Sequence, residues 1–149
     1  MIAVIQRVKS SSVKVEGQII GQIGMGLNIL LGVKKGDSKD DVLKLVQKIV
    51  NLRIFQDAQG KMNLSLLDVQ GEMLIISQFT LTGNIKKGRR PSFDESENPD
   101  LAKVLYEDFV CEVDKLGIKT QTGEFAAYMD VHIQNDGPVT FIIDSYELN

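Results

Sequence analysis

The spacing of apolar residues predicts that the chain opens with a run of β-strands. Residues 1–9 are mostly apolar and rich in β-branched side chains. The dipeptide Glu16-Gly17 is typical of a hairpin turn into a second strand over residues 18–23. Residues 27–33 are apolar almost without interruption, which indicates a strand at the centre of a sheet.

Two later stretches have the periodicity of amphipathic helices with one buried face. The first follows Ser38, a residue that caps helix N-termini, and the second follows Asn98-Pro99, a cap with proline in the first turn. The apolar face of the first stretch consists of Val42, Leu45, Val46, Ile49 and Val50. The face of the second, which ends at Gly117, consists of Leu101, Leu105, Phe109, Val113 and Leu116.

Shorter strand patterns occupy the rest of the chain, apart from a polar loop at residues 82–98. They cover residues 53–55, 72–81, 118–122, 129–134 and 139–144. Residues 135–138 are expected to form the loop that joins the last two strands. A count of about eight strands and two helices, with the strands in runs, predicts an α+β fold in a single domain over residues 1–149. We expect a strongly curved, barrel-like β-sheet with the two main helices packed on it.

Composition and charge restrict the class of protein. The chain has 149 residues, of which 43% are hydrophobic and 25% are charged, an ordinary balance for a water-soluble protein. No apolar run approaches the roughly 20 residues of a membrane span, and there is one cysteine, Cys111. These features predict a cytoplasmic protein without a membrane partner. Because the net charge is −3, any RNA contact must come from a local basic cluster.

The few metal-binding and nucleophilic side chains exclude several kinds of site. His132 is the only histidine, and the alternation of residues 131–133 predicts that it faces solvent. Cys111 lies beside the apolar face of the second helix, which favours a packing role over a nucleophilic one. One histidine and one cysteine do not make the usual zinc sites, and we expect no metal and no cofactor.

Ser77-Gln78-Phe79-Thr80 ends a strand pattern with polar side chains among apolar ones. The segment is either a strand that passes from the core to the edge of the sheet or the floor of a cleft. In a cleft, its backbone N–H groups and Thr80 could bind a developing oxyanion. Thr80 is not expected to act as a nucleophile, because no base lies near it in the sequence.

A basic cluster within the loop at residues 82–98 is a second candidate. Lys86, Lys87, Arg89 and Arg90 place four cations in five residues. Such a cluster is either a solvated loop or a contact for phosphate groups, to which arginine donates bidentate hydrogen bonds.

Two separated segments together resemble the signature motifs of the D-aminoacyl-tRNA deacylases. The first motif is Ser77-Gln78-Phe79-Thr80-Leu81, and the second is Asn135-Asp136-Gly137-Pro138-Val139-Thr140. The resemblance continues through residues 5–8, 60–63, 90–93 and 122–126 and so spans the chain. Two motifs in the matching order and spacing are far more specific than either alone.

The resemblance implies a homodimer that hydrolyses the ester between a D-amino acid and tRNA, with active sites at the subunit interface. It implies that Gly137-Pro138 is a cis dipeptide, oriented by Arg7, which enters the pocket of the partner subunit where an L side chain would lie. Residues 77–80 would line that pocket around the 3′-terminal adenosine and the ester. The residues that resemble those near the pocket mouth are Phe125 and Met129.

The chemistry fits the residues present. An aminoacyl ester is already activated, so its hydrolysis needs positioning and oxyanion stabilisation more than a strong nucleophile. The resemblance implies that the 2′-hydroxyl of the tRNA assists. A backbone wall at Gly137-Pro138 would reject L-aminoacyl-tRNA by clash and accept many D-amino acids. Glycine has no side chain to reject, so glycyl-tRNA is an expected second substrate.

Two other functions remain open at this point. A curved sheet and a basic cluster are compatible with a non-catalytic RNA-binding module, although 6% aromatic residues and no tryptophan are few for a base-stacking platform. The other is a structural dimer without a ligand. Loss of the amino acid from D-aminoacyl-tRNA separates the enzyme from the module, and tRNA binding at low salt separates the module from the structural dimer.

Overall fold

The computed structural model describes residues 1–86 and 88–148, and its first strand organises the sheet. This strand, β1 (Ile2–Val15), pairs antiparallel with β8 (Asp130–Asp144) along one edge. Along the other edge it pairs antiparallel with two strands in succession, which are β3 (Gly26–Gly32) and β2 (Gln18–Ile23).

Two parallel strands extend the sheet beyond β3. β6 (Glu72–Ser77) runs parallel to β3, and β7 (Thr120–Thr122) runs parallel to β6, which gives the order β2-β1-β3-β6-β7. The sheet curls until β2 lies against β7. Gly21 on β2 permits this approach, because a Cβ atom there would lie 2.6 Å from the carbonyl oxygen of Thr122. The predicted strongly curved, barrel-like sheet is therefore confirmed, with the 27–33 segment at its centre as β3.

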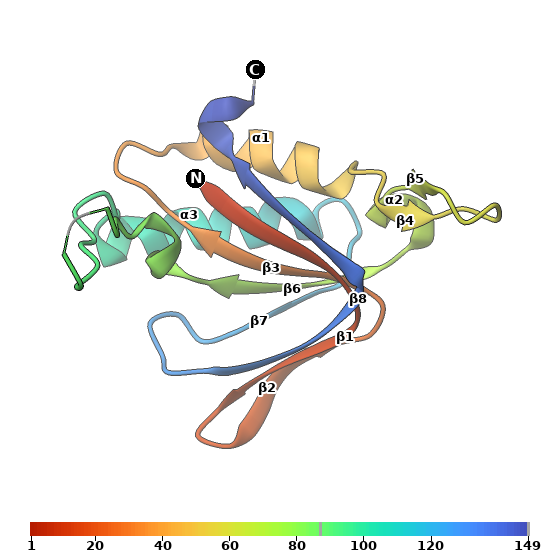
Figure 1. Ribbon diagram of the computed structural model, residues 1–149, viewed down its shortest axis with the longest axis horizontal. Helices are drawn as coiled ribbons and strands as arrows, with labels where there is room; N and C mark the ends of the chain where they lie inside the picture. Colours follow the sequence, from red (N-terminus) through yellow and green to blue (C-terminus); the bar gives the residue numbers. More distant parts are fainter. Residues whose placement is uncertain (87, 149) are drawn as a thin grey trace.

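Two long helices cover one face of the sheet and bury the larger apolar core (Figure 1). α1 (Lys39–Val50) buries all five apolar residues of its predicted face. α3 (Pro99–Asp114) buries the middle of its predicted face, whereas Leu101 and Leu116 stay exposed at the two ends. A smaller core fills the inside of the curl and consists of Val8, Val13, Ile23, Leu74 and Ile76. The predicted α+β fold with two main helices is confirmed.

The strand predicted over residues 53–55 is shifted along the chain, because β4 covers Phe55–Gln56. Four further short elements were not expected from periodicity. They are β5 (Met62–Leu64), α2 (Leu66–Val69), and the 3-10 helices η1 (Phe79–Thr82) and η2 (Ser145–Glu147). β4 and β5 form a small antiparallel pair at one end of the molecule (Figure 1). Over residues 1–86 and 88–148, none of the helices has the length and apolar character needed to span a membrane.

The strand predicted over residues 72–81 is too long. β6 ends at Ser77, and η1 follows it directly. The Thr82 hydroxyl donates to the carbonyl oxygen of Phe79 at 2.7 Å, and the Gly83 N–H donates to the carbonyl oxygen of Thr80 at 3.1 Å. This segment therefore satisfies its backbone groups locally, where a strand would need a neighbour.

The loop predicted at residues 135–138 is also wrong. β8 runs through it as one strand and joins the two strands expected before and after it. Residues 136–139 bulge out opposite Arg7 of β1, and pairing with β1 resumes on both sides. Asn135 closes the bulge, because its side-chain oxygen accepts a hydrogen bond from the Val139 N–H at 2.7 Å. The sequence of residues 135–138 is typical of a turn, but in this fold it forms a β-bulge.

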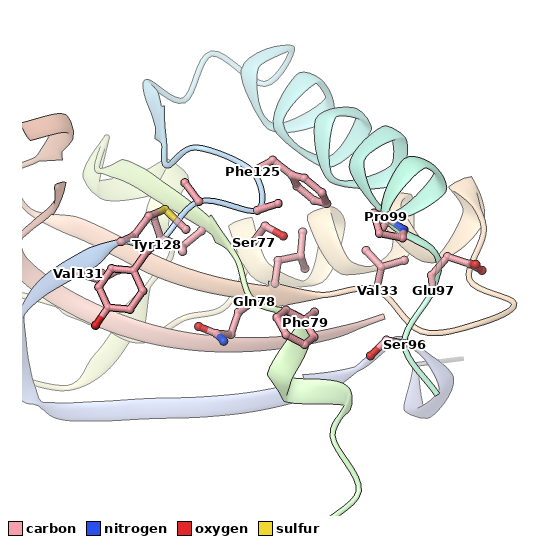
Figure 2. A pocket seen from close by; sticks show the side chains of 16 residues that line it. Val33, Ser77, Gln78, Phe79, Ser96, Glu97, Pro99, Phe125, Tyr128 and Val131 are labelled. Carbon is pink, nitrogen blue, oxygen red and sulfur yellow. The ribbon is translucent and has the colours of Figure 1, made fainter. Parts of the chain in front are cut away.

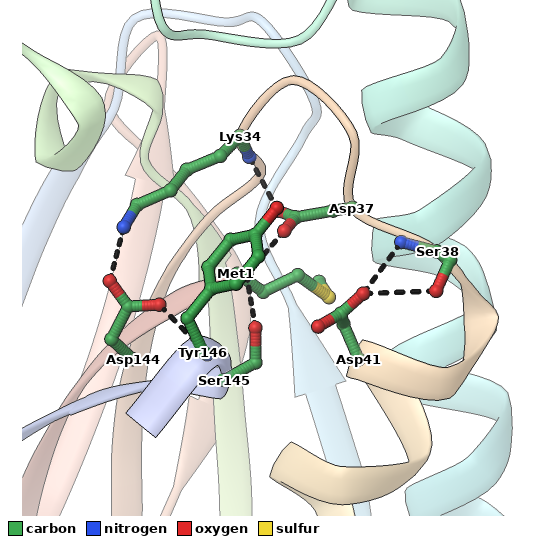
Figure 3. Close-up of polar contacts among 8 residues, drawn as sticks. All are labelled: Met1, Lys34, Asp37, Ser38, Asp41, Asp144, Ser145 and Tyr146. Atoms are coloured by element: carbon green, nitrogen blue, oxygen red, sulfur yellow. Dashed lines mark hydrogen bonds and ion pairs between the residues drawn. The ribbon is translucent and has the colours of Figure 1, made fainter. Parts of the chain in front are cut away.

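A buried ion pair holds the start of β1 against the loop before α1 (Figure 3). The N-terminal ammonium group of Met1 lies 2.6 Å from Oδ1 of Asp37, and both residues have fully buried side chains. The ammonium group also donates to the Ser145 hydroxyl at 2.5 Å, and the second carboxylate oxygen of Asp37 accepts the Lys34 N–H at 2.6 Å. One charged centre thus joins the start of β1, the end of β8 and the approach to α1.

Glu72, at the start of β6, forms a second and more exposed link. Its carboxylate accepts a hydrogen bond from Lys119 Nζ at 2.6 Å and another from the Gly24 N–H at 2.7 Å. The Lys119 bond first, and then the Gly24 bond, lower the pKa of the Glu72 carboxyl. Since the folded-state pKa lies below the unfolded-state pKa, the stabilisation is present above the unfolded-state pKa and is lost as pH falls through the folded-state pKa.

We therefore expect Glu72→Gln to lower the free energy of unfolding at pH 7 by about 0.5–1 kcal/mol, as for a partly exposed ion pair. The difference from wild type is expected to shrink as the pH is lowered. Urea unfolding of both proteins over a descending pH series measures it. A difference that stays constant over the series would contradict the assignment of the link to the charged carboxylate.

Candidate active site

An open cavity of about 500 Å³ lies where the ends of β3 and β6 meet the start of α3 and the segment before β8 (Figure 2). Its walls come from residues 31–33, 76–79, 96–102 and 125–131. Most of the lining side chains are apolar, and the polar ones gather on the segments after β6 and before α3. Apolar walls with a few polar groups are typical of a small-molecule binding site.

The end of β6 supplies the polar wall. Ser77 is the last residue of the strand, and the Gln78 N–H donates to the carbonyl oxygen of Leu31 at 2.8 Å, which keeps the segment against β3. The Gln78 side-chain amide donates to the hydroxyl of Thr80. Because a helix leaves its first N–H groups without partners inside the helix, the start of η1 offers backbone donors next to this wall. The wall can bind a carbonyl oxygen that becomes negatively charged.

Phe125 forms an apolar wall that is supported from behind. Its ring centroid lies 5.9 Å from that of Tyr106, a buried residue of α3 whose hydroxyl donates to the carbonyl oxygen of Ile75 at 2.7 Å. Burial raises the pKa of the Tyr106 hydroxyl, so this donor stays neutral. Gly123 allows Met129 to lie close, because a Cβ atom on Gly123 would lie 2.5 Å from the Met129 sulfur. This side of the cavity is therefore fixed by packing.

The Gly137-Pro138 peptide bond is cis, and both residues are exposed on the bulge of β8. Arg7 is only 5% exposed and holds the base of the bulge. Its Nε donates to the carbonyl oxygen of Asp136 at 3.1 Å, and its Nη1 donates to the carbonyl oxygen of Ile54 at 2.5 Å. Within the described part of the chain, the dipeptide does not line the cavity of its own chain.

Comparisons with known proteins assign this arrangement to one family. The family model described as D-Tyr-tRNA(Tyr) deacylase matches residues 4–144. The chain belongs to this family. A D-aminoacyl-tRNA deacylase of Persephonella marina is 62% identical over 148 residues, which cover 99% of this chain and 100% of the relative. A D-aminoacyl-tRNA deacylase of Aquifex aeolicus is 59% identical over 148 residues, with the same coverage.

Two solved structures share the fold of this chain. The c-Myc DNA unwinding element binding protein has a TM-score of 0.91 and 41% identity, over 97% of this chain and 98% of that one. A probable eukaryotic D-amino acid tRNA deacylase has a TM-score of 0.80 over 95% of this chain and 97% of that one. Its identity is 17%, so it supports the fold alone. The predicted membership in this family of hydrolases is confirmed by these comparisons.

The deacylase fold gathers the predicted site residues into two groups. The first group lines the cavity and consists of Ser77, Gln78, Phe79, Phe125 and Met129. Thr80 follows this group, is exposed, and is joined to it through the Gln78 amide. The second group is the bulge, with Arg7, Gly137 and Pro138. Among the described residues, the second group does not line the cavity of the first.

The remaining candidate residues of the deacylase lie at the surface. Three cations of the basic cluster, Lys86, Arg89 and Arg90, are exposed on the loop after η1, and Lys87 lies outside the described residues. His132 is exposed, as predicted. Cys111 is exposed on α3, so the packing role expected for it is wrong. In residues 1–86 and 88–148, no group of three or more His, Cys, Asp or Glu side chains is placed to hold a metal ion.

Sequence reasoning missed part of the cavity wall. The additional lining residues include Ser96, Glu97, Ala102, Ala127 and Tyr128. In a sequence, small residues and residues at helix starts look like ordinary loop or core positions. The sequence alone therefore did not indicate that these residues line a cavity. Tyr128 is the exception, because an aromatic side chain that is 91% exposed between small residues is unusual.

Proposed function

We propose that this protein hydrolyses the ester bond of D-aminoacyl-tRNA in the cytoplasm and rejects L-aminoacyl-tRNA. The observation that carries the proposal is the meeting of the motif residues Ser77–Phe79 with Phe125 and Met129 around one cavity. The apolar walls suit the base of a terminal adenosine, and the neutral polar wall suits the ester. The relatives at 62% and 59% identity are named for this activity.

Hydrolysis at this site requires no protein nucleophile. The hydroxyl of Ser77 and the carboxylate of Glu97 line the cavity, and among the described lining residues there is no histidine, lysine or cysteine. Because the ester is already activated, attack by water needs none of these groups as a nucleophile. A water molecule forms a bond to the ester carbonyl carbon, the bond between that carbon and the ribose oxygen breaks, and the ribose oxygen takes up a proton. Backbone N–H groups at the start of η1 stabilise the oxyanion, and the 2′-hydroxyl of the tRNA assists. The products are the free amino acid and tRNA.

Thr80→Ala tests whether the Thr80 hydroxyl takes part in bond formation. Because the hydroxyl makes only a neutral hydrogen bond with Gln78, we expect kcat/KM for D-Tyr-tRNA to fall by less than about tenfold. Thr80→Ser, which retains a hydroxyl, is the matched control and should behave in the same way. A loss of all activity in the alanine variant, with activity kept in the serine variant, would assign a covalent role to Thr80.

Chiral selection is proposed to come from the Gly137-Pro138 bulge of a second copy of the chain. Three features support this: the dipeptide is exposed, it is held by Arg7 and Asn135, and it does not line the cavity of its own described chain. A rigid backbone segment placed over the ester would clash with an L side chain and leave room for hydrogen, whatever the D side chain is.

The edge of β8 supports a homodimer. In the described part of the chain, β8 pairs with β1 along one edge and no strand covers the other edge. Phe141 and Ile142 on this strand are 42% and 69% exposed. An uncovered apolar edge strand promotes association, and a second copy would cover it. Sedimentation velocity is expected to give a dimer for the wild type and a monomer without activity for Ile142→Asp. A fully active monomeric protein would contradict the shared site.

Incubation with matched D-Tyr-tRNA and L-Tyr-tRNA tests the proposed function. We expect the D form to lose its amino acid and the L form to keep it. A protein that binds both and releases neither amino acid would be an RNA-binding module.

Glycyl-tRNA is expected to be cleaved as well, because glycine has no side chain for the backbone wall to reject. The measurement is the release of glycine at enzyme concentrations that clear D-Tyr-tRNA. Complete inertness toward glycyl-tRNA at those concentrations would contradict selection by a steric wall alone.

A further inference from the structure

The described residues between η1 and α3 project beside the cavity, at the left of Figure 1. Two backbone hydrogen bonds between Asn84 and Ser92, of 2.8 Å and 3.0 Å, close it like a short hairpin. The returning limb is tied to the segment after β3, because the Lys35 N–H donates to the carbonyl oxygen of Glu95 at 2.9 Å and the Glu97 N–H donates to that of Val33 at 3.1 Å. The base of the loop is therefore fixed next to the cavity wall.

Two phenylalanine rings meet at this base. Phe79 and Phe93 have ring centroids 4.9 Å apart with an interplanar angle of 62°. Phe79 lines the cavity and yet is 58% exposed, and Phe93 is 36% exposed. Gly83 allows the Phe93 ring to lie close to it, because a Cβ atom on Gly83 would lie 3.0 Å from the ring. The pair thus offers aromatic surface to solvent at the edge of the cavity, which an interior core pair would not do.

The tip of the same loop is positively charged. Lys86, Arg89 and Arg90 are exposed there, on a chain whose net charge is −3. The acidic residues Asp94 and Glu95 follow on the returning limb, so the cations are concentrated at the tip. Aromatic rings beside exposed cations are the elements with which proteins bind single-stranded nucleic acid, since bases stack on the rings and phosphates meet the cations.

We propose that the Phe79–Phe93 pair is a stacking platform for the base that precedes the terminal adenosine of the tRNA, and that the cations at the loop tip contact the phosphates next to it. This inference rests on the proposed function, which places the terminal adenosine in the cavity. A base that precedes the adenosine leaves the cavity at its edge, where Phe79 is exposed. The unpaired acceptor end of a tRNA has free base faces to stack, whereas the paired stem has none.

The test compares two substrates that differ by one nucleotide. D-tyrosyl-adenosine fills only the cavity, and the D-tyrosyl ester of the dinucleotide CpA also reaches the platform. We expect wild type to have a higher kcat/KM for the dinucleotide, and we expect Phe93→Ala to reduce this advantage by about fivefold or more, the loss typical of one stacked base. Phe93→Tyr keeps an aromatic ring and should keep the advantage. Ile85→Ala is the matched control, because Ile85 is a 78% exposed apolar residue of the same loop outside the ring pair.

The outcomes separate the platform from the enzyme. If wild type cleaves neither ester, the proposed function and the platform both fail. If wild type cleaves D-tyrosyl-adenosine but the advantage of the dinucleotide is the same in Phe93→Ala, only the platform fails. If Phe93→Ala dissociates the protein into monomers in sedimentation, the rings belong to a protein interface and the proposal is overturned.

The interaction with phosphate has its own measurement. The double variant Lys86→Ala with Arg89→Ala is expected to bind D-aminoacyl-tRNA more weakly and to show a shallower dependence of affinity on salt, by about one unit of slope for each phosphate that is no longer neutralised. If the slope of tRNA affinity against salt concentration is unchanged, the loop tip does not contact the phosphates of the tRNA.

Discussion

Replacing Gly137 with alanine is expected to lower kcat/KM for D-Tyr-tRNA by about 100-fold or more, because a displacement of roughly 1 Å in a positioning group can cost that much. Gly137 has φ of +137°, a conformation that L side chains rarely adopt. A Cβ atom there would lie 2.7 Å from Cγ2 of Val139 and 3.0 Å from its backbone nitrogen. The bulge must therefore shift, and with it the backbone proposed to select the D configuration.

A second glycine separates this effect from a loss of stability. Gly60 has φ of +75°, and a Cβ atom there would have no neighbouring atom within 4 Å. Gly60→Ala and Gly137→Ala should each lower the free energy of unfolding by about 1–2 kcal/mol through backbone strain, and only Gly137→Ala should lose the activity. Urea unfolding and D-Tyr-tRNA hydrolysis are measured on the same preparations. If the folded Gly137→Ala variant has full activity, the Gly137-Pro138 dipeptide takes no part in the active site.

Mixing two inactive variants tests whether the dipeptide acts on a second copy. Ala127→Trp fills the cavity of its own chain, and Gly137→Ala disturbs the bulge. In a mixed dimer, the open cavity of the Gly137→Ala chain would receive the intact bulge of the Ala127→Trp chain. Random exchange would then restore about a quarter of wild-type activity, since half of the dimers are mixed and each has one competent site. If bulge and cavity belonged to the same chain, the mixture would stay inactive.

The helices and the central strands of this fold could be predicted because their signals are local. Every residue predicted on the apolar face of α1 is buried, since a period of 3.6 residues and burial against a sheet are the same constraint. The continuous apolar run at residues 27–33 became β3 for a similar reason, because a strand between two neighbours and under two helices has no solvated face.

The bulge of β8 could not be predicted because its cause is not local. The sequence from Asn135 to Pro138 has the composition of a turn. The long neighbouring strand β1 keeps it inside a strand, and buried Arg7 holds the bulge from β1, 129 residues away along the chain. The signature motifs marked the segment as important without indicating its shape. The cavity wall could not be predicted for the same reason. Ala102 and Ala127 line the cavity only because α3 and the segment before β8 come together in the fold.

The ion pair between Met1 and Asp37 could not be predicted from the spacing of apolar residues. Asp37 stands in a polar stretch before α1, where a sequence predicts a solvated loop residue. In the fold its side chain is fully buried, and its carboxylate accepts hydrogen bonds from the Met1 ammonium group and the Lys34 N–H. Two charges removed from water in this way depend on each other, because each compensates the desolvation of the other.

Replacing Asp37 with asparagine is therefore expected to lower the free energy of unfolding by about 3–5 kcal/mol, the cost typical of leaving one member of a buried pair uncompensated. Two other pairs provide a graded control. Asp144→Asn breaks the pair with Lys34, whose side chains are 22% and 25% exposed, and Glu107→Gln breaks the pair with Lys103, whose side chains are 61% and 55% exposed. We expect the free energy of unfolding to fall by about 1 kcal/mol in the first control and by at most about 0.5 kcal/mol in the second, because exposure to water weakens an ion pair.

Urea unfolding at low and high salt measures all three losses, and high salt should make only the losses of the two controls smaller. Equal losses in all three variants would mean that burial of the Met1 ammonium group adds nothing, and that this corner of the fold is held by packing alone.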